Sequence, residues 1–247
     1  LLSQDTSSYG KDLRDGTELS GLLRALSTVP GDYWIRIFYC YPNSFTNEVL
    51  EVMASDPRFC RYLDMPFQHI SDPVLKKMNR KITRKEIEAT MSRVRSQLPD
   101  VAWRTTFIVG FPTETDQDFE ELVDFVSEGH FQHLGIFLYS DEDNIRSSKF
   151  GDPIPLSLKE ERKNRLMEIQ QKISRKHHQN MVGSLQQVLV GGFSSETDLL
   201  LEGRNQYQGP EVDGVVYINE GNATSAGFHQ VEITEAHEYD LVGKILN

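Results

Sequence analysis

The residues of this chain that could carry chemistry gather in two segments in which an apolar stretch runs into a loop and then into a helix. Residues 62–80 carry an amide, an imidazole and a guanidinium in Gln68, His69 and Arg80, and residues 106–115 carry glycine, proline and hydroxyl groups. In α/β proteins, ligands bind at the carboxyl ends of parallel strands. We therefore expect a binding site where the strands of these two segments end.

Each of these residue types has a functional and a structural interpretation. Gly110, followed by Phe111 and Pro112, lets the backbone approach a flat ligand closely, or it only ends the strand. Arg36 lies within an apolar strand, so it requires a carboxylate partner or a place at a strand end, and a structural ion pair is one solution. His69 is either a base or ligand, or an ordinary hydrogen-bonding loop residue. The residue types alone leave these alternatives open.

The composition narrows the class of protein. The 247 residues, 38% of them hydrophobic, suit a soluble protein with one large domain or two smaller ones. No apolar run approaches the roughly 18 residues of a membrane helix, and the P-loop, dinucleotide, serine-hydrolase and zinc-protease motifs are absent.

Two cysteines, Cys40 and Cys60, suit a reducing cytoplasm. Because the chain starts without Met or a leader, we expect a cytoplasmic fragment of a longer protein.

The net charge of −11 is distributed unevenly. Residues 182–247 contain ten acidic side chains against two basic ones, Arg204 and Lys244, which leaves this tail at −8. An acidic module repels nucleic-acid phosphates and attracts basic proteins. The alternative interpretation is a solvated surface that promotes solubility.

Strand-like and helix-like stretches alternate through residues 1–180. The strand candidates are residues 33–40, 62–65, 101–109 and 133–139. Capping boxes at Thr83 and Ser157 predict the starts of two helices, and Leu166, Ile169 and Ile173 predict the inward face of the second. This order predicts an α/β fold with a parallel sheet and right-handed crossovers, either an open barrel or a doubly wound sheet.

A second domain is expected after residue 180. The strand candidates there are residues 185–190, 198–201, 214–218, 230–234 and 240–245, separated by glycine-rich turns. Short strands with such turns predict a small antiparallel β-barrel. We thus expect domains at 1–180 and 181–247, joined by a helix whose last residues, His177 and His178, are solvated.

The motifs together resemble a known family. The segments that carry the resemblance are residues 2–13, 36–42, 63–71, 78–80, 105–115 and 137–140. In this order they resemble the radical S-adenosylmethionine (SAM) methylthiotransferases, and the tail resembles the TRAM domain that closes those enzymes. Gln4-Asp5-Thr6 and residues 68–71 are similar to the RimO branch, which modifies ribosomal protein S-12. The MiaB branch, which modifies tRNA, has Gln-Asn and Gln-Ser-Gly-Ser there.

The resemblance implies a partial, open TIM-type radical SAM barrel followed by the TRAM barrel. It implies SAM and two 4Fe–4S clusters as cofactors, an external electron donor, and a methylthio group placed on the β-carbon of an S-12 aspartate. The acidic tail suits a basic ribosomal protein better than RNA as the direct partner. The expected cofactor-binding residues are Gln4, Asp5, Arg36, Gln68, Arg80, Val109 and Gly110, and the expected substrate-binding residues are His69, Tyr139 and Ser140. A carboxylate substrate favours Arg36 or Arg80 near the reacting centre.

The chain also departs from the family. The C-x-x-x-C-x-x-C motif that holds the radical SAM cluster is missing, and neither Cys40 nor Cys60 can replace it. We expect those cysteines upstream of Leu1, so that this fragment alone holds no metal and is inactive. The family's Gly-Thr pair is replaced by Asn144 and Ile145. Two alternatives remain: a MiaB-type tRNA enzyme, and a non-catalytic module that binds ribosomal protein.

Overall fold

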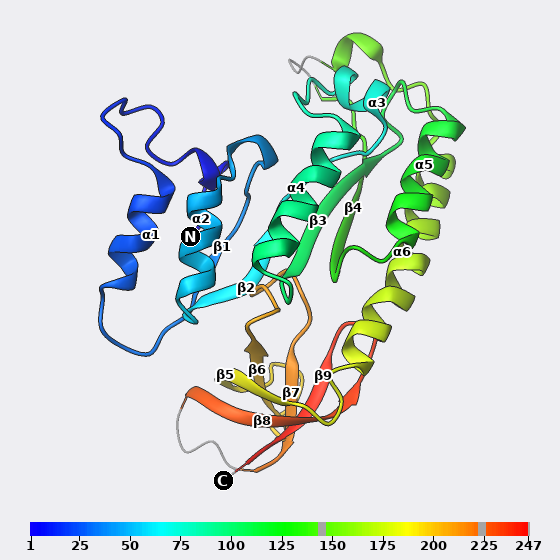
Figure 1. The fold of residues 1–247 in the computed structure, drawn as a ribbon. Helices are drawn as coiled ribbons and strands as arrows, with labels where there is room; N and C mark the ends of the chain where they lie inside the picture. The colour runs from blue at the N-terminus through cyan, green and yellow to red at the C-terminus, as the bar shows by residue number, and fades with distance from the viewer. Residues whose placement is uncertain (143–146, 222–225, 247) are drawn as a thin grey trace. The chain divides into compact units, whose positions relative to one another are not determined.

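The computed structural model describes residues 1–142, 147–221 and 226–246. They form two compact units, Leu1–Gln170 and Gln171–Asn247, which run from blue through green and from yellow to red in Figure 1. A long helix, α6 (Leu156–Gln179), crosses the division between the units, so the expected boundary at residue 180 stays a prediction. Within the described residues, we find no helix with the length and apolar character needed to cross a bilayer.

The N-terminal unit contains a sheet of four parallel strands. They are β1 (Ile35–Ile37), β2 (Phe59–Asp64), β3 (Ala102–Val109) and β4 (His133–Leu138), and they pair in the order β1-β2-β3-β4. A doubly wound sheet would reverse its strand order at a switch point, whereas a barrel adds each strand next to the preceding one. Four of the eight strands of a TIM barrel make an open sheet, so the prediction of a partial barrel is confirmed.

Helices connect the strands. They are α1 (Leu19–Ser27), α2 (Asn47–Ser55), α3 (Asp72–Lys77), α4 (Arg84–Gln97), α5 (Asp116–Ser127) and α6, with 3₁₀ turns at Thr6–Ser8, Pro42–Ser44 and Ser148–Phe150. Thr83 caps α4 through the expected capping box, and Thr115 caps α5 in the same way. The prediction that Ser157 caps α6 is wrong, because the helix begins one residue earlier and the carbonyl of Pro155 accepts its first hydrogen bonds.

The core lies on one face of the sheet. Along β3, Trp103, Thr105, Phe107 and Val109 are buried, whereas Arg104, Thr106 and Ile108 are half-buried on the opposite face. Phe131 joins Phe107 to Phe125 of α5, with ring centroids 5.8 Å apart in both pairs. The alternation of a strand therefore separates a packed face from an open face that is available for ligands.

Helix α6 buries polar groups where apolar ones were expected. Leu166 is fully buried as predicted, but Ile169 and Ile173 are only half-buried. Lys159, Arg162, Gln170, Ser174 and His178 are the polar residues of this helix that the structure buries. The expectation that His178 is solvated is therefore wrong, since its Nδ1 lies 3.2 Å from the carbonyl oxygen of His237.

The C-terminal unit is a closed barrel. Its strands are β5 (Leu185–Phe193), β6 (Leu201–Asn205), β7 (Val216–Glu220), β8 (Gly227–Ala236) and β9 (Leu241–Ile245), in the order β5-β6-β7-β9-β8. All neighbours are antiparallel except β7 and β9. A strand at 198–201 was predicted too early, because Phe193 pairs with Leu201 and the residues between them connect the two strands. The predicted small barrel itself is confirmed.

Candidate functional site

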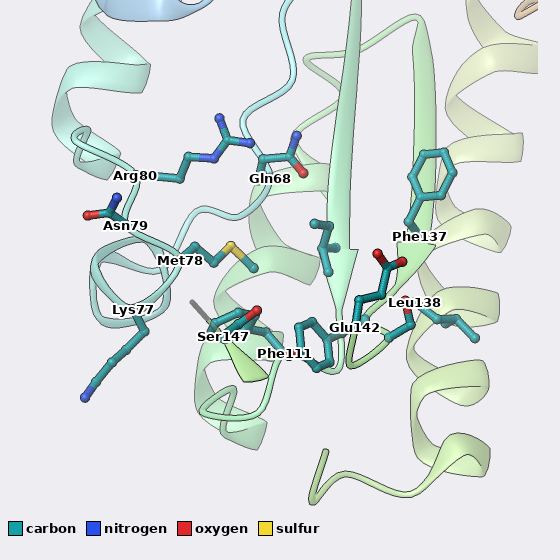
Figure 2. Close-up of a pocket in the computed structure, with 13 residues that line it drawn as sticks. Gln68, Lys77, Met78, Asn79, Arg80, Phe111, Phe137, Leu138, Glu142 and Ser147 are labelled. Atoms are coloured by element: carbon teal, nitrogen blue, oxygen red, sulfur yellow. The ribbon is translucent and has the colours of Figure 1, made fainter. Parts of the chain in front are cut away.

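A cavity of about 440 Å³ opens at the carboxyl ends of β3 and β4 (Figure 2). Its lining residues come from the loop after β2, the end of α3, and the ends of β3 and β4. They are Gln68, Lys77, Met78, Asn79, Arg80, Ile108, Phe111, Phe137, Leu138, Tyr139, Ser140, Glu142 and Ser147. This volume is within the range of about 300–1,000 Å³ that small-molecule sites occupy.

Gln68 reaches the cavity from a constrained backbone. Its N–H donates to the carbonyl of Thr106 and its carbonyl accepts from the N–H of Ile108, both at 2.8 Å. Its φ of +73° lies in the left-handed region, which costs a residue with a side chain roughly 1 kcal/mol. The two hydrogen bonds to β3 hold this unfavourable conformation, and strain of this kind is concentrated at functional sites.

Arg80 supplies a cation on the same side of the cavity. The chain turns after α3 through Asn79, whose φ of +59° ends the helix, and the N–H of Arg80 donates to the carbonyl of Leu75. The guanidinium carbon of Arg80 lies 5.9 Å from the centre of the Tyr41 ring. In Figure 2 the Arg80 side chain extends toward Gln68, so a guanidinium and an amide can act on one polar group of a ligand.

The remaining wall is aromatic and apolar. Phe111 and Tyr139 pack edge to face with ring centroids 5.3 Å apart, above the buried Val74. Phe137 points away from the core and is 60% exposed, an unusual position for a phenylalanine within a strand. The phenolic oxygen of Tyr139 is buried, and within the described residues it has no hydrogen-bond partner. The cavity thus suits a ligand with a flat ring, a hydrogen-bonding group and an anionic end.

The loop between β3 and α5 forms the base of this wall. Gly110 has a φ of +74°, and the Glu114 carboxylate accepts the N–H groups of Gly110 and Phe111. Burial raises the pKa of Glu114 to about 7, against the opposing effects of Arg162 and the two N–H groups. Glu114 therefore stabilises the turn at Gly110, which lies between the lining residues Ile108 and Phe111 but does not itself line the cavity.

The face of the sheet that carries Arg104 also holds a second set of polar and aromatic groups, of which Tyr62 and Asp64 are buried. The Arg36 guanidinium carbon lies 5.3 Å from the centre of the Tyr62 ring, and that ring lies 5.9 Å from the His133 ring. Arg104 Nε is 3.9 Å from Asp64 Oδ1. Arg104 and His133 were not among the expected site residues, although polar residues at alternate positions of apolar strands were a signal for them.

The structure brings some of the expected residues together and separates others. Gln68, Arg80, Tyr139 and Ser140 line the cavity, whereas Val109 is buried next to it. Gln4 is exposed, and Asp5 accepts hydrogen bonds from the hydroxyls of Ser7 and Ser8. These two residues do not line the cavity.

His69 is fully buried and does not line the cavity either. Its Nδ1 accepts the N–H of Ser71 at 3.0 Å, so the imidazole completes a local turn. Burial lowers the pKa of His69 to about 4, which keeps the ring neutral at physiological pH. A contact between His69 and a substrate therefore stays a prediction that would require the loop to open.

Metal-binding groups are not gathered in the described part of the chain. Within it, we find no cluster of three His, Cys, Asp or Glu side chains able to hold a metal ion. Cys40 and Cys60 are both buried free thiols, and burial raises the pKa of Cys40, which disfavours the thiolate. The replacement at Asn144 and Ile145 lies outside the described residues.

Two family models match the chain. Residues 2–126 match the model of the radical SAM superfamily, and residues 182–246 match that of the TRAM domain. The first match covers the cavity residues from Gln68 to Phe111, whereas the lining residues from Phe137 onward lie beyond it.

Curated relatives match the whole chain. A protein of Geotalea uraniireducens named ribosomal protein uS12 methylthiotransferase RimO is 42% identical over 246 residues, which are 100% of this chain and 55% of that protein. A protein of the same name from Bdellovibrio bacteriovorus is 46% identical over 251 residues, with the same coverage of 100% and 55%. The chain spans about half the length of these relatives.

Among solved structures, coproporphyrinogen III oxidase (HemN) from Escherichia coli, titled a radical SAM enzyme, aligns with a TM-score of 0.49 and 14% identity. The alignment covers 76% of this chain and 50% of that one. Similarity at this level carries no functional argument.

Proposed function

The chain belongs to the radical SAM superfamily, and we propose that it is part of a methylthiotransferase of the RimO type that modifies an aspartate of ribosomal protein uS12. The observation that carries the proposal is the identity of 42–46% along the entire chain to curated relatives that bear this name. The MiaB-type alternative is not favoured, because these relatives are named for a ribosomal protein substrate and the acidic tail disfavours RNA. The non-catalytic module is the alternative that detection of SAM cleavage and uS12 modification would exclude.

The cavity fits SAM in chemical character. Phe111, Tyr139 and Ile108 provide a flat apolar wall for an adenine ring, and Arg80 with Gln68 provides donors for a carboxylate. The buried Tyr139 hydroxyl supports this assignment, because a buried polar group without a partner calls for a bound one. We therefore assign these residues to SAM binding, with Gly110 and Val109 shaping the wall. Gln4 and Asp5 remain proposed contacts on the expectation from the family alone.

The iron–sulfur clusters do not fit the residues that the structure describes, since no ligand set is present there. We assign their ligands to parts of the complete protein outside this chain, and an external donor would supply their electrons. With SAM, a reduced cluster in the complete protein would supply the radical chemistry that acts on the substrate C–H bond. The role of this chain is to bind and orient SAM and the substrate and to keep water from the reacting centre.

The substrate aspartate requires a cation at a fixed place. The open face of the sheet offers Arg36, held against the Tyr62 ring, and Arg104, close to Asp64. Arg80 at the cavity is the alternative cation, and Ser140 beside it offers a neutral hydroxyl donor. A planar guanidinium held by an aromatic ring is well suited to a carboxylate, so we propose Arg36 as the first candidate.

The acidic C-terminal unit is the proposed docking element for the basic substrate protein. Its residues 182–247 carry a net charge of −8, which raises the local concentration of a cationic partner and disfavours nucleic acid. We further propose that the TRAM domain begins at residue 181 and that the complete protein works in the cytoplasm. Because salt screens such attraction, we expect a higher salt concentration to weaken binding to the ribosomal protein.

The proposal is tested with the complete protein, reconstituted anaerobically with iron and sulfide and supplied with SAM and a reductant. We expect cleavage of SAM to 5′-deoxyadenosine when uS12 is present. Arg80→Gln should raise the dissociation constant of SAM at least about tenfold, the effect of losing one charged hydrogen bond. Lys81→Gln, an exposed neighbour outside the cavity, is the matched control. Absence of SAM binding by the wild-type protein would contradict the assignment.

A further inference from the structure

A run of positive charge lies where α3 ends and α4 begins. Residues 76–85, the lysine run, contain six basic side chains and no acidic one, although the whole chain has a net charge of −11. The basic residues are Lys76, Lys77, Arg80, Lys81, Arg84 and Lys85. Because the lysine run contributes Lys77 and Arg80 to the lining of the cavity, it lies at the edge of the sheet where the cavity opens.

The carboxylates nearest in sequence do not neutralise these lysines. Glu86 accepts the N–H and the hydroxyl of Thr83 in the capping box, and Glu88 pairs with Arg84 at 2.8 Å. Asp72 accepts the N–H of Arg84. The exposed lysines of the run are Lys76, Lys77, Lys81 and Lys85. Among the residues that the structure describes, none of these four ammonium groups forms an ion pair.

A second segment brings another cation to the same place. Lys149 Nζ lies 5.0 Å, and Lys77 Nζ 5.5 Å, from the centre of the Phe150 ring. That ring packs on Phe111 of the cavity wall, with the ring centroids 6.1 Å apart. In Figure 2 the Lys77 side chain points away from Arg80, so it is not directed toward the donors assigned to SAM. Two segments therefore place cations at the rim of the cavity in addition to those donors.

Helix stability does not require all of this charge. Lys76 and Lys77 suit the end of α3, but Arg84 and Lys85 occupy the first turn of α4, where the helix dipole disfavours cations. A surface that only promotes solubility carries charges of both signs, whereas a block of about five or six like charges often binds an oppositely charged partner. The lysine run therefore favours a binding surface over a merely solvated one.

The residue type indicates the chemistry of the partner. Interfaces between proteins are enriched in arginine and aromatic residues and depleted in lysine. Four of the six basic residues of the run are lysines, whose compact ammonium groups on flexible stems suit phosphate groups. Phosphates along a nucleic-acid chain also release condensed counterions when cations neutralise them, which favours binding. RNA phosphates therefore fit the lysine run better than the carboxylates of an acidic protein.

We propose that the lysine run binds RNA phosphates, and that the complete protein meets uS12 within the ribosomal subunit that carries it. The identity of the substrate rests on the proposed function, whereas phosphate binding by the lysine run does not. The RNA is not the substance modified; it surrounds the substrate protein. Residues 182–247, with their charge of −8, suit the basic protein, and the lysine run suits the RNA to which that protein is bound.

The test uses the complete, cluster-loaded protein and the triple variant Lys76→Gln, Lys81→Gln and Lys85→Gln, three lysines that do not line the cavity. A second triple variant replaces the same lysines with arginine and keeps the charge. The matched control removes the same charge from exposed positions on other elements, by Lys11→Gln, Lys172→Gln and Lys176→Gln. Thermal melting verifies that every variant is folded.

Three probes separate the possible partners: ribosomal subunits with unmodified uS12, the RNA of that subunit freed of protein, and purified uS12. Filter binding measures the dissociation constants of the subunits and of the RNA at several salt concentrations. Activity is measured with a chemical reductant, and then with a protein electron donor. Equilibrium dialysis measures the dissociation constant of SAM.

We expect the glutamine triple variant to bind subunits and RNA at least about tenfold more weakly, and its plot of log affinity against log salt to lose about 2 units of slope. Its affinity for SAM and its activity on purified uS12 should stay unchanged. The arginine variant and the control should bind subunits and RNA as the wild-type protein does.

Three results would overturn the proposal. Wild-type protein that binds neither subunits nor RNA lacks the phosphate site. Equal losses in the glutamine variant and in the control would reflect net charge rather than the lysine run. A loss of activity confined to reactions with the protein electron donor, with unchanged RNA binding, would assign the run to an acidic protein.

Failure of the proposed function gives a different result. In that case the wild-type protein modifies uS12 neither in the purified state nor in the subunit, although RNA binding still depends on the lysine run. That outcome overturns the ribosomal context and supports the phosphate site.

Discussion

Substituting alanine for Gly110 tests how closely the turn after β3 rests on α6. The residue has a φ of +74°, and an added Cβ would overlap Cγ and Cδ of Lys159. Lys159 cannot easily move away, because its ammonium group is held by the carbonyl of Tyr139 and by Asp152. The substitution must therefore strain the backbone and displace a buried cation.

The expected cost has two parts. The left-handed backbone costs an alanine about 1 kcal/mol, and overpacking against a held side chain costs about 1–3 kcal/mol. Gly110→Ala should therefore lower the free energy of unfolding by about 2–4 kcal/mol. Gly151→Ala is the matched control, because Gly151 has a similar φ of +64° and nothing near its Cβ position. It should cost only about 1 kcal/mol.

Urea unfolding of the complete protein, with far-ultraviolet circular dichroism as the signal, measures both costs. The part that depends on Lys159 is isolated by repeating Gly110→Ala in a Lys159→Ala background, where the cost should fall to that of Gly151→Ala. Equal costs for Gly110→Ala and Gly151→Ala in the wild-type background would refute the reasoning, since they would mean that α6 yields freely to the turn.

Thr83→Ala removes the capping box of α4 and should cost about 1 kcal/mol in urea unfolding, whereas a cost near zero would contradict the cap. The pKa of His69 is about 4 in the folded protein against 6.5 in the unfolded chain. The neutral imidazole therefore contributes stability above pH 6.5, and that stability is lost as pH falls toward 4. The pKa of Glu114 is about 7 in the folded protein against 4.5 in the unfolded chain, so this residue contributes stability that is lost as pH rises from 4.5 toward 7. Between pH 4.5 and 6.5, His69 contributes a positive slope to the plot of unfolding free energy against pH, and Glu114 a negative one. His69→Gln should therefore make the measured slope more negative, and Glu114→Gln should make it more positive; unchanged slopes would contradict this. Peptide mapping should find Cys40 and Cys60 unalkylated by iodoacetamide until the protein unfolds, and rapid native labelling would contradict their burial.

The sequence predicted the residues of the site best where they lie near strand ends. Gln68 and Arg80 were expected there because a buried strand stops at Pro66, and the structure places both at the cavity. Arg104 and His133 were missed, because a charged residue inside a strand shows its direction only once the register of the sheet is known. Periodicity predicted that these strands exist but not which face of each is open.

Contacts between distant segments were the hardest to predict. Lys159 and Arg162 lie in a helix of mostly polar sequence, and their burial depends on Tyr139 and Glu114, twenty and forty-eight residues away. Glu114 lies within residues 105–115, but nothing in the local sequence shows that its carboxylate turns back to the N–H of Gly110. Such pairs follow from tertiary packing rather than from local pattern.

The most direct test of the central claim compares two substrates side by side. The complete protein, reconstituted with iron and sulfide, is incubated with SAM, a reductant and either purified uS12 or unmodified tRNA, and the products are weighed by mass spectrometry. We expect the mass gain of one methylthio group on an aspartate of uS12 and none on tRNA. Modification of tRNA alone, or of neither substrate, would contradict it.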